Sequence, residues 1–417
     1  MLPTIWPFMR VAGNQAVRRG RGWQVAMLLG GLILAGLLPG AIEAQGGDAT
    51  LPPPAALPEY GVLVQQCGAG VQPRGPDFAA SGLIVTTFSR DAMWVVDLDR
   101  RMRYPLPETR PCAPNCRPSP DRWRLLYVSP ETATFWTMRP DGYDRQPAFP
   151  YYVSELDWWD ETHWLVWPTA GRPAIYPIGV PPEQGEPVHL ADFDTFSIQP
   201  GGYYGLRLAQ GSAEWPVLEL VNLEDGEALP LLEVKPYSGG AVWSPDGARL
   251  AYIGRGEVDP LVGLAGAEVF LVEPGVADAV RVTNLTGLYG AVRLSGEQMT
   301  HALSWSPDGR YLAFWVIEII GPDMAANVGH AVIHVLDTAS GKITAYCGFA
   351  TNRVSPRLPA LVWSPDGRYI AFGVDVPEDE RAALLLILDT LSGDYTEVSE
   401  GMYAAYGTYD PVMWGVR

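Results

Sequence analysis

The sequence predicts an all-β protein, a β-propeller in which four-stranded blades form a ring. Three observations support this prediction: a ten-residue motif recurs along the chain, Gly and Pro are abundant, and apolar residues are plentiful. The 45 Gly and 39 Pro among 417 residues would interrupt helices too often, since both residues break helices and mark turns. With 47% apolar and 18% charged residues, the chain can bury a sizeable core.

The motif that recurs is "WSPDGRYLAF" at 305–314, with near-identical copies "WSPDGRYIAF" at 363–372 and "WSPDGARLAY" at 243–252. Its Ser-Pro-Asp-Gly segment predicts a tight turn, because Pro fixes φ at the second position and Gly accepts a positive φ at the last. A strand is expected on each side of this turn. The run from Tyr311 to Phe314 is apolar on both faces, which indicates a strand that is covered on both sides.

Three weaker copies, "PSPDRWRLLY", "WWDETHWLVW" and "IQPGGYYGLR", keep the turn near the same offset, and further strand-like runs lie between copies. The copies begin at residues 118, 158, 198, 243, 305 and 363. Four-stranded repeats of about 40 to 50 residues are typical of propeller blades, which bury both faces only when neighbours stack on them.

The two ends of this repeat region complete each other. Residues 82–88 and 92–106 supply three strands of a blade without its innermost one, and residues 410–416 supply an innermost strand without a blade. We therefore predict seven blades over residues 80–417, closed by pairing of the C-terminal strand with N-terminal strands. Six blades with a free C-terminal tail is the alternative.

The motif "WSPDG" followed by "LAF" or "LAY" resembles the TolB-type, WD40-like propeller repeat. That repeat occurs in periplasmic TolB-like proteins and in the propeller domains of prolyl oligopeptidase-like enzymes. The resemblance covers about residues 80–417 and implies the fold. It implies no functional residue, because the repeat residues of that family are structural. No "GxSxG" nucleophile elbow occurs in this sequence, so a serine hydrolase is not expected.

The N-terminal segment, residues 1–45, reads as a signal peptide or signal anchor: four Arg precede an apolar run from Val25 to Leu38. Residues 46–79 read as a Pro-rich linker and lead-in. We expect an exported, extracytoplasmic protein, whether secreted, periplasmic or tethered to a membrane through its N-terminal segment. The formal charge of −18 argues against a nucleic-acid partner.

Two groups of residues could form a metal or sugar site, but a structural role is the preferred interpretation of each. His330 and His334 would lie about 13 Å apart on a strand, too far to share a metal. The Trp cluster at positions 158, 159, 164 and 167 could stack on sugars, yet packing between blades is favoured. No catalytic residue, metal site or cofactor is therefore predicted.

Four Cys are present, and an exported chain meets oxidising conditions. Cys112 and Cys116 in "CAPNC" are predicted to form a small disulfide loop rather than half of a zinc site. Cys67 and Cys347 could form a second disulfide, but the sequence leaves this pairing open.

The predicted function is that of a monomeric, non-enzymatic binding or scaffold module for a protein or cell-envelope partner. The alternatives are a propeller enzyme, lyase- or lactonase-like, with a site in the central channel, and a glycan-binding module. The longest insertions, 254–266, 286–301, 318–330, 347–359 and 400–410, all join strands at the mouth opposite the Ser-Pro-Asp-Gly turns. Because Tyr, Arg and Met commonly anchor interfaces, the candidate contacts there are Tyr289, Arg293, Met324, Arg353, Arg357, Tyr403 and Tyr406.

Overall fold

The computed structural model describes the chain over residues 62–87, 92–110, 116–181, 188–189, 197–209, 217–233, 240–275, 279–294, 303–321, 328–351, 358–376, 383–399 and 410–417. The predicted signal segment, 1–45, and residues 46–61 of the predicted linker lie outside these residues, so both stay predictions. No helix in the described ranges is long and apolar enough to cross a membrane. The only helix there is the five-residue α1 (Leu285–Tyr289).

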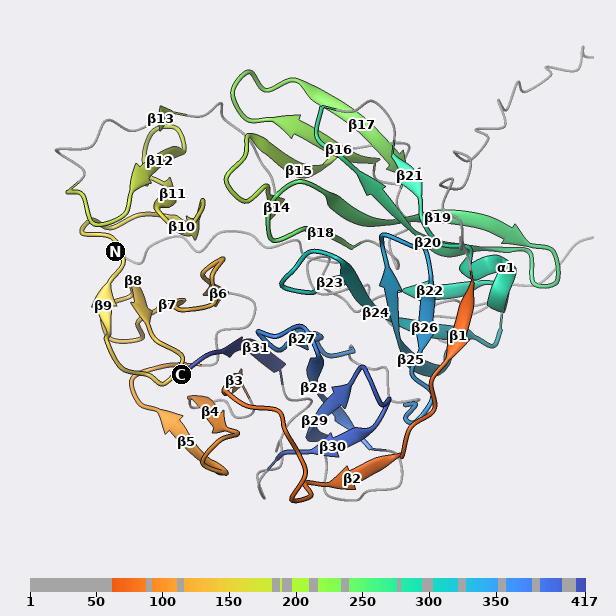
Figure 1. Ribbon diagram of the computed structural model, residues 1–417. Coiled ribbons are helices and arrows are strands. Elements are labelled where there is room, and N and C mark those ends of the chain that lie inside the picture. The colour runs from red at the N-terminus through yellow and green to blue at the C-terminus, as the bar shows by residue number, and fades with distance from the viewer. Residues whose placement is uncertain are drawn as a thin grey trace, which may run out of the picture. The chain divides into compact units, whose positions relative to one another are not determined.

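The described strands form seven sheets arranged as blades around a common centre, as Figure 1 shows. Blade 1 consists, from the inside outward, of β31 (Asp410–Gly415), β3 (Leu83–Thr87), β4 (Met93–Asp97) and β5 (Met102–Leu106). Blade 2 consists of β6 (Arg117–Pro118), β7 (Leu125–Val128), β8 (Phe135–Met138) and β9 (Gln146–Pro147). Blade 3 consists of β10 (Glu155–Trp158), β11 (His163–Trp167), β12 (Ala174–Pro177) and β13 (Val188–His189).

The remaining blades follow in chain order. Blade 4 consists of β14 (Ser197–Ile198), β15 (Tyr204–Ala209), β16 (Val217–Asn222) and β17 (Ala228–Glu233). Blade 5 consists of β18 (Ala241–Trp243), β19 (Leu250–Asp259), β20 (Leu264–Val272) and β21 (Val280–Arg281). Blade 6 contains β23 (Leu303–Trp305), β24 (Tyr311–Ile319), β25 (Val328–Asp337) and β26 (Ile343–Ala345). Blade 7 contains β27 (Val362–Trp363), β28 (Tyr369–Asp375), β29 (Ala383–Asp389) and β30 (Tyr395–Glu397).

The ring closes through blade 1, as predicted. The C-terminal strand β31 pairs antiparallel with β3 and so becomes the innermost strand of a blade whose other strands come from the N-terminal side. The Trp414 indole donates a 2.9 Å hydrogen bond to the carbonyl of Ser81, and the guanidinium of Arg417 pairs with the fully buried carboxylate of Asp97. Seven blades and closure by the two ends of the chain are therefore confirmed.

The strands that follow the motif are covered on both faces, also as predicted. Along β24, Leu312 and Phe314 pack into the core shared with blade 5, and the alternate residues, such as Trp315, pack into the core shared with blade 7. Successive side chains of a strand point to opposite faces. An uninterrupted apolar run is therefore what a strand between two neighbouring blades requires.

The Ser-Pro-Asp-Gly turn has the same hydrogen bonds in each intact copy. In blade 6, the Ser306 hydroxyl donates to Asp308, while the amide of Tyr311 donates to the Ser306 oxygen at 2.9 Å. The glycine at the end of the turn, Gly309, has a φ of 67°, a left-handed conformation that glycine adopts without strain. The Asp of the motif thus stabilises the turn, as expected.

The Trp of the motif connects neighbouring blades. The indole of Trp363 donates at 3.0 Å to the carbonyl of Ser304 in blade 6, and that of Trp305 donates at 3.1 Å to the carbonyl of Val242 in blade 5. In both cases the acceptor is the residue immediately before the motif Trp of the neighbouring blade. The repeat therefore encodes an inter-blade hydrogen bond as well as a turn.

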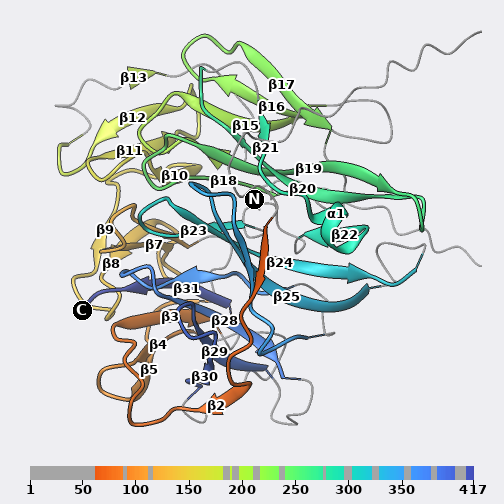
Figure 2. The same ribbon diagram turned by 45° about the vertical axis from the view of Figure 1, so that its right-hand side comes forward.

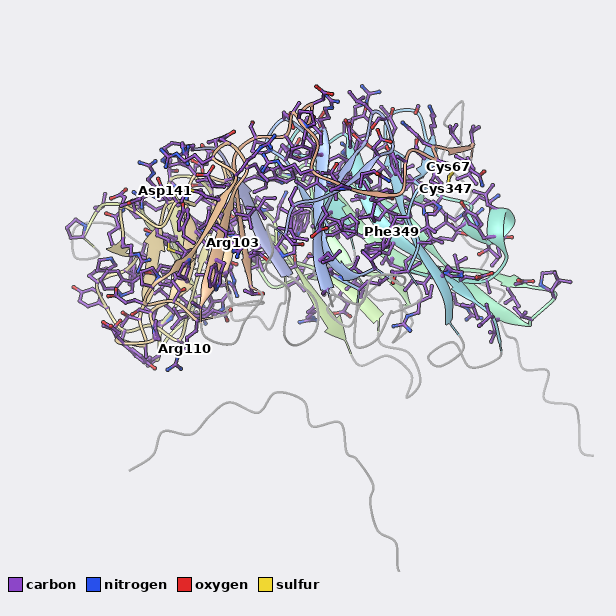
Figure 3. All side chains as sticks on the ribbon, turned by 90° about the horizontal axis from the view of Figure 1, so that it is seen from below. Cys67, Arg103, Arg110, Asp141, Cys347 and Phe349 are labelled. Carbon is purple, nitrogen blue, oxygen red and sulfur yellow. A yellow bond between two sulfur atoms is a disulfide. The ribbon has the colours of Figure 1, made fainter. Side chains whose placement is uncertain are left out.

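Residues 62–74 form a strap along the outer edges of blades 6 and 7. β1 (Leu63–Gln65) pairs parallel with β26, and β2 (Val71–Pro73) pairs parallel with β30. Between them, Cys67 forms a disulfide with Cys347, and Figure 3 shows the two side by side at the rim. The structure thus settles a pairing that the sequence left open. Cys116 is disulfide-bonded too, but Cys112 lies outside the described residues, so the "CAPNC" pairing stays a prediction.

Candidate functional site

The two faces of the ring differ in what they carry. The Ser-Pro-Asp-Gly turns join the first and second strands of each blade, so they lie on one face, here called the turn face. The connections from second to third strand, and from one blade to the next, lie on the opposite face. Of the seven predicted contacts, Tyr289 and Arg293 are described. The other five, Met324, Arg353, Arg357, Tyr403 and Tyr406, lie outside the described residues.

The insertion at 254–266 differs from its prediction, because it is a strand ribbon and not a loop. β19 and β20 run through it, and only residues 260–263 lie outside the strands. Glycines occur within both strands of the ribbon. A Cβ on Gly254 would lie 2.7 Å from the Phe270 ring, and one on Gly266 would lie 2.5 Å from the Thr286 hydroxyl. These glycines permit close packing, a common role for glycine within strands.

The segment 284–294, at the start of the second insertion, is also ordered by buried acidic side chains. The carboxylate of Glu268, which is fully buried, accepts hydrogen bonds from the Thr283 hydroxyl and from the amides of Leu285 and Thr286. The carboxylate of Asp259 accepts a 2.9 Å bond from the amide of Ala291. These bonds fix α1 and the following strand, β22 (Val292–Leu294), against the ribbon.

Tyr289 ends α1 and is held by a histidine of blade 6. The Tyr289 hydroxyl lies 2.7 Å from Nε2 of His334, and Nδ1 of His334 lies 3.0 Å from the carbonyl oxygen of Val332. Because a carbonyl only accepts, Nδ1 carries the proton, and the phenol donates to Nε2. Burial lowers the pKa of His334 to about 4 and raises that of Tyr289 to about 12. Both groups are therefore neutral at physiological pH.

This pair answers the histidine question raised by the sequence. His334 is 2% exposed and satisfied at both ring nitrogens, while His330 is exposed on the same strand. No group of three or more His, Cys, Asp or Glu side chains suited to a metal occurs within the described ranges. His334 acts as a support for Tyr289.

Exposed apolar side chains occur on three segments of the opposite face: the tip of the β19–β20 ribbon, the end of α1 and the residue after β24. We call them the apolar patch: Val258, Leu261, Val262, Tyr289 and Ile320. Leu261 is 91% exposed and Ile320 64%. The three segments are neighbours, since the Asp259 carboxylate accepts from the amide of Ala291, and Val292 of β22 lies opposite Glu318 of β24. Figure 2 shows the ends of β19, β20, β24 and β25 on the same side as α1.

Arg293 also lies at this face, in β22 opposite Ile317 of β24, and it is half-buried. The sequence predicts Tyr289 and Arg293 as candidate contacts, which stays a prediction, but it does not single out the aliphatic members of the patch. The signal was present in "DPLVGL" at 259–264, where three apolar residues occupy the tip of a predicted connection. Polar residues are usual at such tips.

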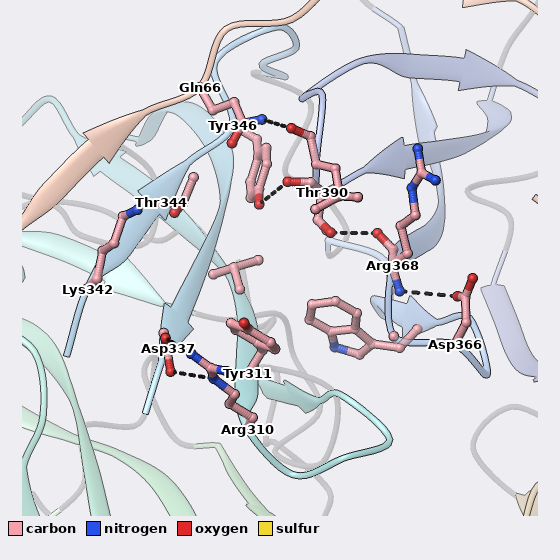
Figure 4. A pocket seen from close by; sticks show the side chains of 14 residues that line it. Gln66, Arg310, Tyr311, Asp337, Lys342, Thr344, Tyr346, Asp366, Arg368 and Thr390 are labelled. Carbon is pink, nitrogen blue, oxygen red and sulfur yellow. Dashed lines mark hydrogen bonds and ion pairs between the residues drawn. The ribbon is translucent and has the colours of Figure 1, made fainter. Parts of the chain in front are cut away.

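The turn face has a polar pocket of about 580 Å3 between blades 6 and 7. Figure 4 shows Tyr311, Lys342, Thr344 and Tyr346 of blade 6 on one side and Arg368 and Thr390 of blade 7 on the other. Arg310 and Arg368 are each paired with a carboxylate, Asp337 and Asp389 respectively. Gln66 of the strap closes the outer side by donating to the carbonyl of Leu391.

One side chain connects two blades that are not neighbours in the ring. Arg122 of blade 2 donates a 2.7 Å hydrogen bond to the carbonyl of Trp363 in blade 7, although blade 1 lies between these blades. It stands at the turn position that is Gly in the intact motif and keeps its positive φ, 59°. Burial lowers the pKa of Arg122 to about 10. The guanidinium thus links blade 2 directly to blade 7.

The Trp cluster of blade 3 packs in the core, as expected. Trp159 and Trp164 are buried, and Trp158 lies against Trp164 with ring centroids 4.2 Å apart. Trp158 also donates at 2.9 Å to the carbonyl of Arg117 in blade 2. Trp167, half-buried, packs against the core between blades 3 and 4.

Comparison with known proteins shows similarity at the level of the fold. No family model matches the sequence, and no curated protein matches it. Among solved structures, a puromycin hydrolase mutant is similar with a TM-score of 0.46 and 15% identity, over 81% of this chain. The chain spans 57% of the length of that hydrolase.

Two further similar structures have lengths closer to that of this chain. TolB from Acinetobacter baumannii has a TM-score of 0.38 and 13% identity, over 87% of this chain and 96% of that one. Oligogalacturonate lyase from Vibrio parahaemolyticus has a TM-score of 0.44 and 14% identity, over 76% and 86%. The predicted propeller is confirmed by the seven blades of the structure. TolB proteins are among the similar structures. These similarities carry no argument about activity.

Proposed function

We propose that this propeller is a binding module that holds a protein partner through the apolar patch on its opposite face. The observation that carries the proposal is the patch itself. Five exposed apolar side chains, with Leu261 almost fully exposed, are carried by neighbouring segments of the opposite face. Contiguous exposed apolar surface is costly in water and commonly marks an interaction site.

The framework of the patch supports this role. Tyr289 is fixed by His334, and α1 is fixed by the buried carboxylate of Glu268. A surface that is ordered before binding loses less conformational entropy on association. Tyr is also among the residues that most often contribute strongly to interfaces.

The test uses two exposed leucines on different faces. A photo-crosslinking amino acid placed at position 261 of the full chain, in cells that produce it, should attach to a partner that mass spectrometry identifies. Leu261→Asp should then weaken the binding of the purified partner at least tenfold, as measured by calorimetry. Leu391→Asp, on the turn face and also well exposed, is the matched control and should change the affinity less than twofold. Equal affinity for all three proteins, or crosslinks only to second copies of this chain, would refute the proposal.

We further propose that the propeller works outside the cytosol, delivered by the segment 1–45 as a signal peptide or membrane anchor. The disulfide between Cys67 and Cys347 supports this location, since such bonds persist in oxidising compartments. A fusion of residues 1–45 to a reporter that is active only after export should be active. A reporter that stays in the cytosol would contradict the proposal.

A further inference from the structure

The three intact copies of the motif allow one blade interface to be compared with the next, position by position. Because the copies align without gaps, Arg249 of blade 5 corresponds to Tyr311 of blade 6 and to Tyr369 of blade 7. In each copy this residue follows the turn and faces the next blade, since its alternate neighbours along the strand, such as Ala251 and Ala313, pack into that interface. These positions therefore define equivalent slots on the turn face.

In the interface between blades 5 and 6, the slot is filled by the guanidinium of Arg249. One nitrogen donates to the carbonyl of Gly309 at 2.5 Å, and the other donates to the Thr338 hydroxyl at 3.1 Å. The guanidinium carbon lies 5.1 Å from the centre of the Trp305 ring. A planar fork with two donors fits this pair of acceptors.

In the interface between blades 4 and 5, a different side chain donates to the equivalent glycine carbonyl. The side-chain amide of Gln199 in blade 4 donates at 2.8 Å to the carbonyl of Gly247, which ends the turn of blade 5. In both interfaces, then, a side chain of the preceding blade satisfies the glycine carbonyl of the following turn.

The interface between blades 6 and 7 has the same acceptors, but none of the described residues donates to them. Gly367 corresponds to Gly309, and Thr390 corresponds to Thr338, since each threonine hydroxyl donates to the carbonyl of the arginine after the turn. Within the described residues, no hydrogen bond reaches the carbonyl of Gly367. The Thr390 hydroxyl oxygen accepts none either, although the Thr390 carbonyl accepts one from the Tyr346 hydroxyl at 3.0 Å. Both residues line the pocket of Figure 4.

Neighbouring side chains do not fill this slot. Tyr311 takes the place of Arg249 and packs against the core that contains Trp363, but its phenol makes no hydrogen bond to either acceptor. Arg310 is held away from the slot by Asp337, with bonds of 2.8 and 3.1 Å. Trp363 is 1% exposed, so its ring is not open to stacking with a ligand. The slot offers a ligand the two acceptors and the volume of the pocket.

We propose that the pocket between blades 6 and 7 binds a guanidinium group from outside the chain, such as an arginine side chain of a peptide. The group would donate to the Gly367 carbonyl and the Thr390 hydroxyl, as Arg249 does one interface earlier. The arginines of the pocket are each neutralised by a bidentate carboxylate, which limits their repulsion of a cation. Lys342 has no carboxylate partner within the described ranges and would favour a ligand that also carries an anionic group.

The direct test is calorimetry of the full chain with three capped tripeptides. Acetyl-Gly-Arg-Gly-amide should bind, while the citrulline peptide, which has the same shape without the charge, should bind at least tenfold more weakly. The lysine peptide should also be weaker, because one ammonium does not present a planar fork. Equal affinity for the arginine and citrulline peptides would overturn the proposal.

Two complementary variants separate the slot from general stability. Tyr311→Arg would supply an internal guanidinium, as in the preceding interface, and should abolish peptide binding without lowering the melting temperature. Arg249→Ala should open a second slot, so that the arginine peptide binds with two sites and restores part of the lost melting temperature. If Tyr311→Arg binds the peptide as well as the wild type does, the slot is not the site. Both variants leave the apolar patch unchanged, so either proposal can fail without the other.

Discussion

Blades 5 to 7 carry the intact motif, whereas blades 2 to 4 carry degraded copies, and the two halves of the ring differ in what holds them together. Within the described residues, the core between blades 6 and 7 contains eighteen buried apolar side chains, and that between blades 3 and 4 contains four. The strap and its disulfide add to blades 6 and 7. The half with the intact repeat is thus also the more extensively packed one.

The degraded copies show that the motif combines two separable devices. Blade 2 keeps the turn, in which the Ser119 oxygen accepts from the amide of Arg124 at 2.9 Å, but has Pro118 in place of Trp. Blade 3 keeps the inter-blade bond through Trp158 but has a different turn. In blade 4, the amide oxygen of Gln199 replaces the Ser oxygen. The turn and the inter-blade bond can therefore be lost independently while the blade persists.

The largest expected effect comes from removing the point where the two halves join. Deleting residues 410–417 removes β31, which lies between the intact blade 7 and the degraded blade 2. The deletion removes the fully buried Trp414 together with its packing contacts. It also leaves the buried carboxylate of Asp97 without its partner Arg417. Burial of one large apolar side chain stabilises by about 2 to 3 kcal/mol, and an unpaired buried charge costs about 3 to 5 kcal/mol.

We therefore expect the truncated chain to lose its cooperative unfolding transition in circular dichroism, in the intact blades as well as the degraded ones. A synthetic peptide with the sequence of residues 410–417 should restore part of the transition. A melting temperature equal to that of the full chain would contradict closure through β31.

The second effect concerns the strap that distinguishes blades 6 and 7. The pair Cys67→Ser and Cys347→Ser opens a loop spanning 280 residues and should lower the free energy of unfolding by about 3 to 5 kcal/mol. The matched control, Cys112→Ser with Cys116→Ser, removes the predicted "CAPNC" disulfide, which would close a much shorter loop, and should cost clearly less. Urea denaturation of both double variants measures the difference. Equal losses would show that the strap adds no special constraint to the intact half.

The third effect is a pH dependence located in blade 6. The folded-state pKa of His334 is about 4, below its ordinary value of about 6.5. The unfolded chain therefore binds a proton that the folded chain does not, so stability is complete above pH 6.5 and falls as the pH drops toward 4. At pH 5 this loss should be about 2 kcal/mol.

Urea denaturation at pH 7.5 and pH 5 tests this for the wild type and for His334→Asn. The variant should be less stable at pH 7.5, because Tyr289 loses its acceptor, but its stability should fall less between the two pH values. The same decrease in both proteins would assign the pH dependence to other groups, such as surface carboxylates.

The fold could be predicted because its signals are local. Each turn depends on four consecutive residues, and each blade strand on a short apolar run, so the seven blades and the closure by β31 follow from the sequence. The pairing of Cys67 with Cys347 could not be predicted, because it depends on where residues 62–74 lie on the finished ring. Parallel pairing of β1 with β26 brings together segments 280 residues apart.

The candidate site was predicted only in part for the same reason. Tyr289 was selected by residue type and by its place in a long insertion, and the structure places it in the apolar patch. Its partner His334 is 45 residues away, and no local pattern connects them. The Gly367 carbonyl and the Thr390 hydroxyl became candidates only because Arg249 donates to the equivalent groups of Gly309 and Thr338. That comparison requires the positions of side chains, which the sequence does not give.

The smallest expected effect compares the same substitution in two blades. The Trp363 indole donates to the carbonyl of Ser304, whereas the indole nitrogen of Trp243, which faces the degraded blade 4, is buried with no hydrogen-bond partner. Trp363→Phe removes one ring of the indole and its hydrogen bond, and it leaves the Ser304 carbonyl without this donor.

Trp243→Phe removes the same ring but no hydrogen bond. Since an unmade buried hydrogen bond costs about 1 to 3 kcal/mol, Trp363→Phe should be more destabilising than Trp243→Phe by about 1 to 2 kcal/mol in urea denaturation at pH 7.5. Equal losses would mean that the inter-blade bond contributes little, and that the Trp of the motif acts through packing alone in both halves of the ring.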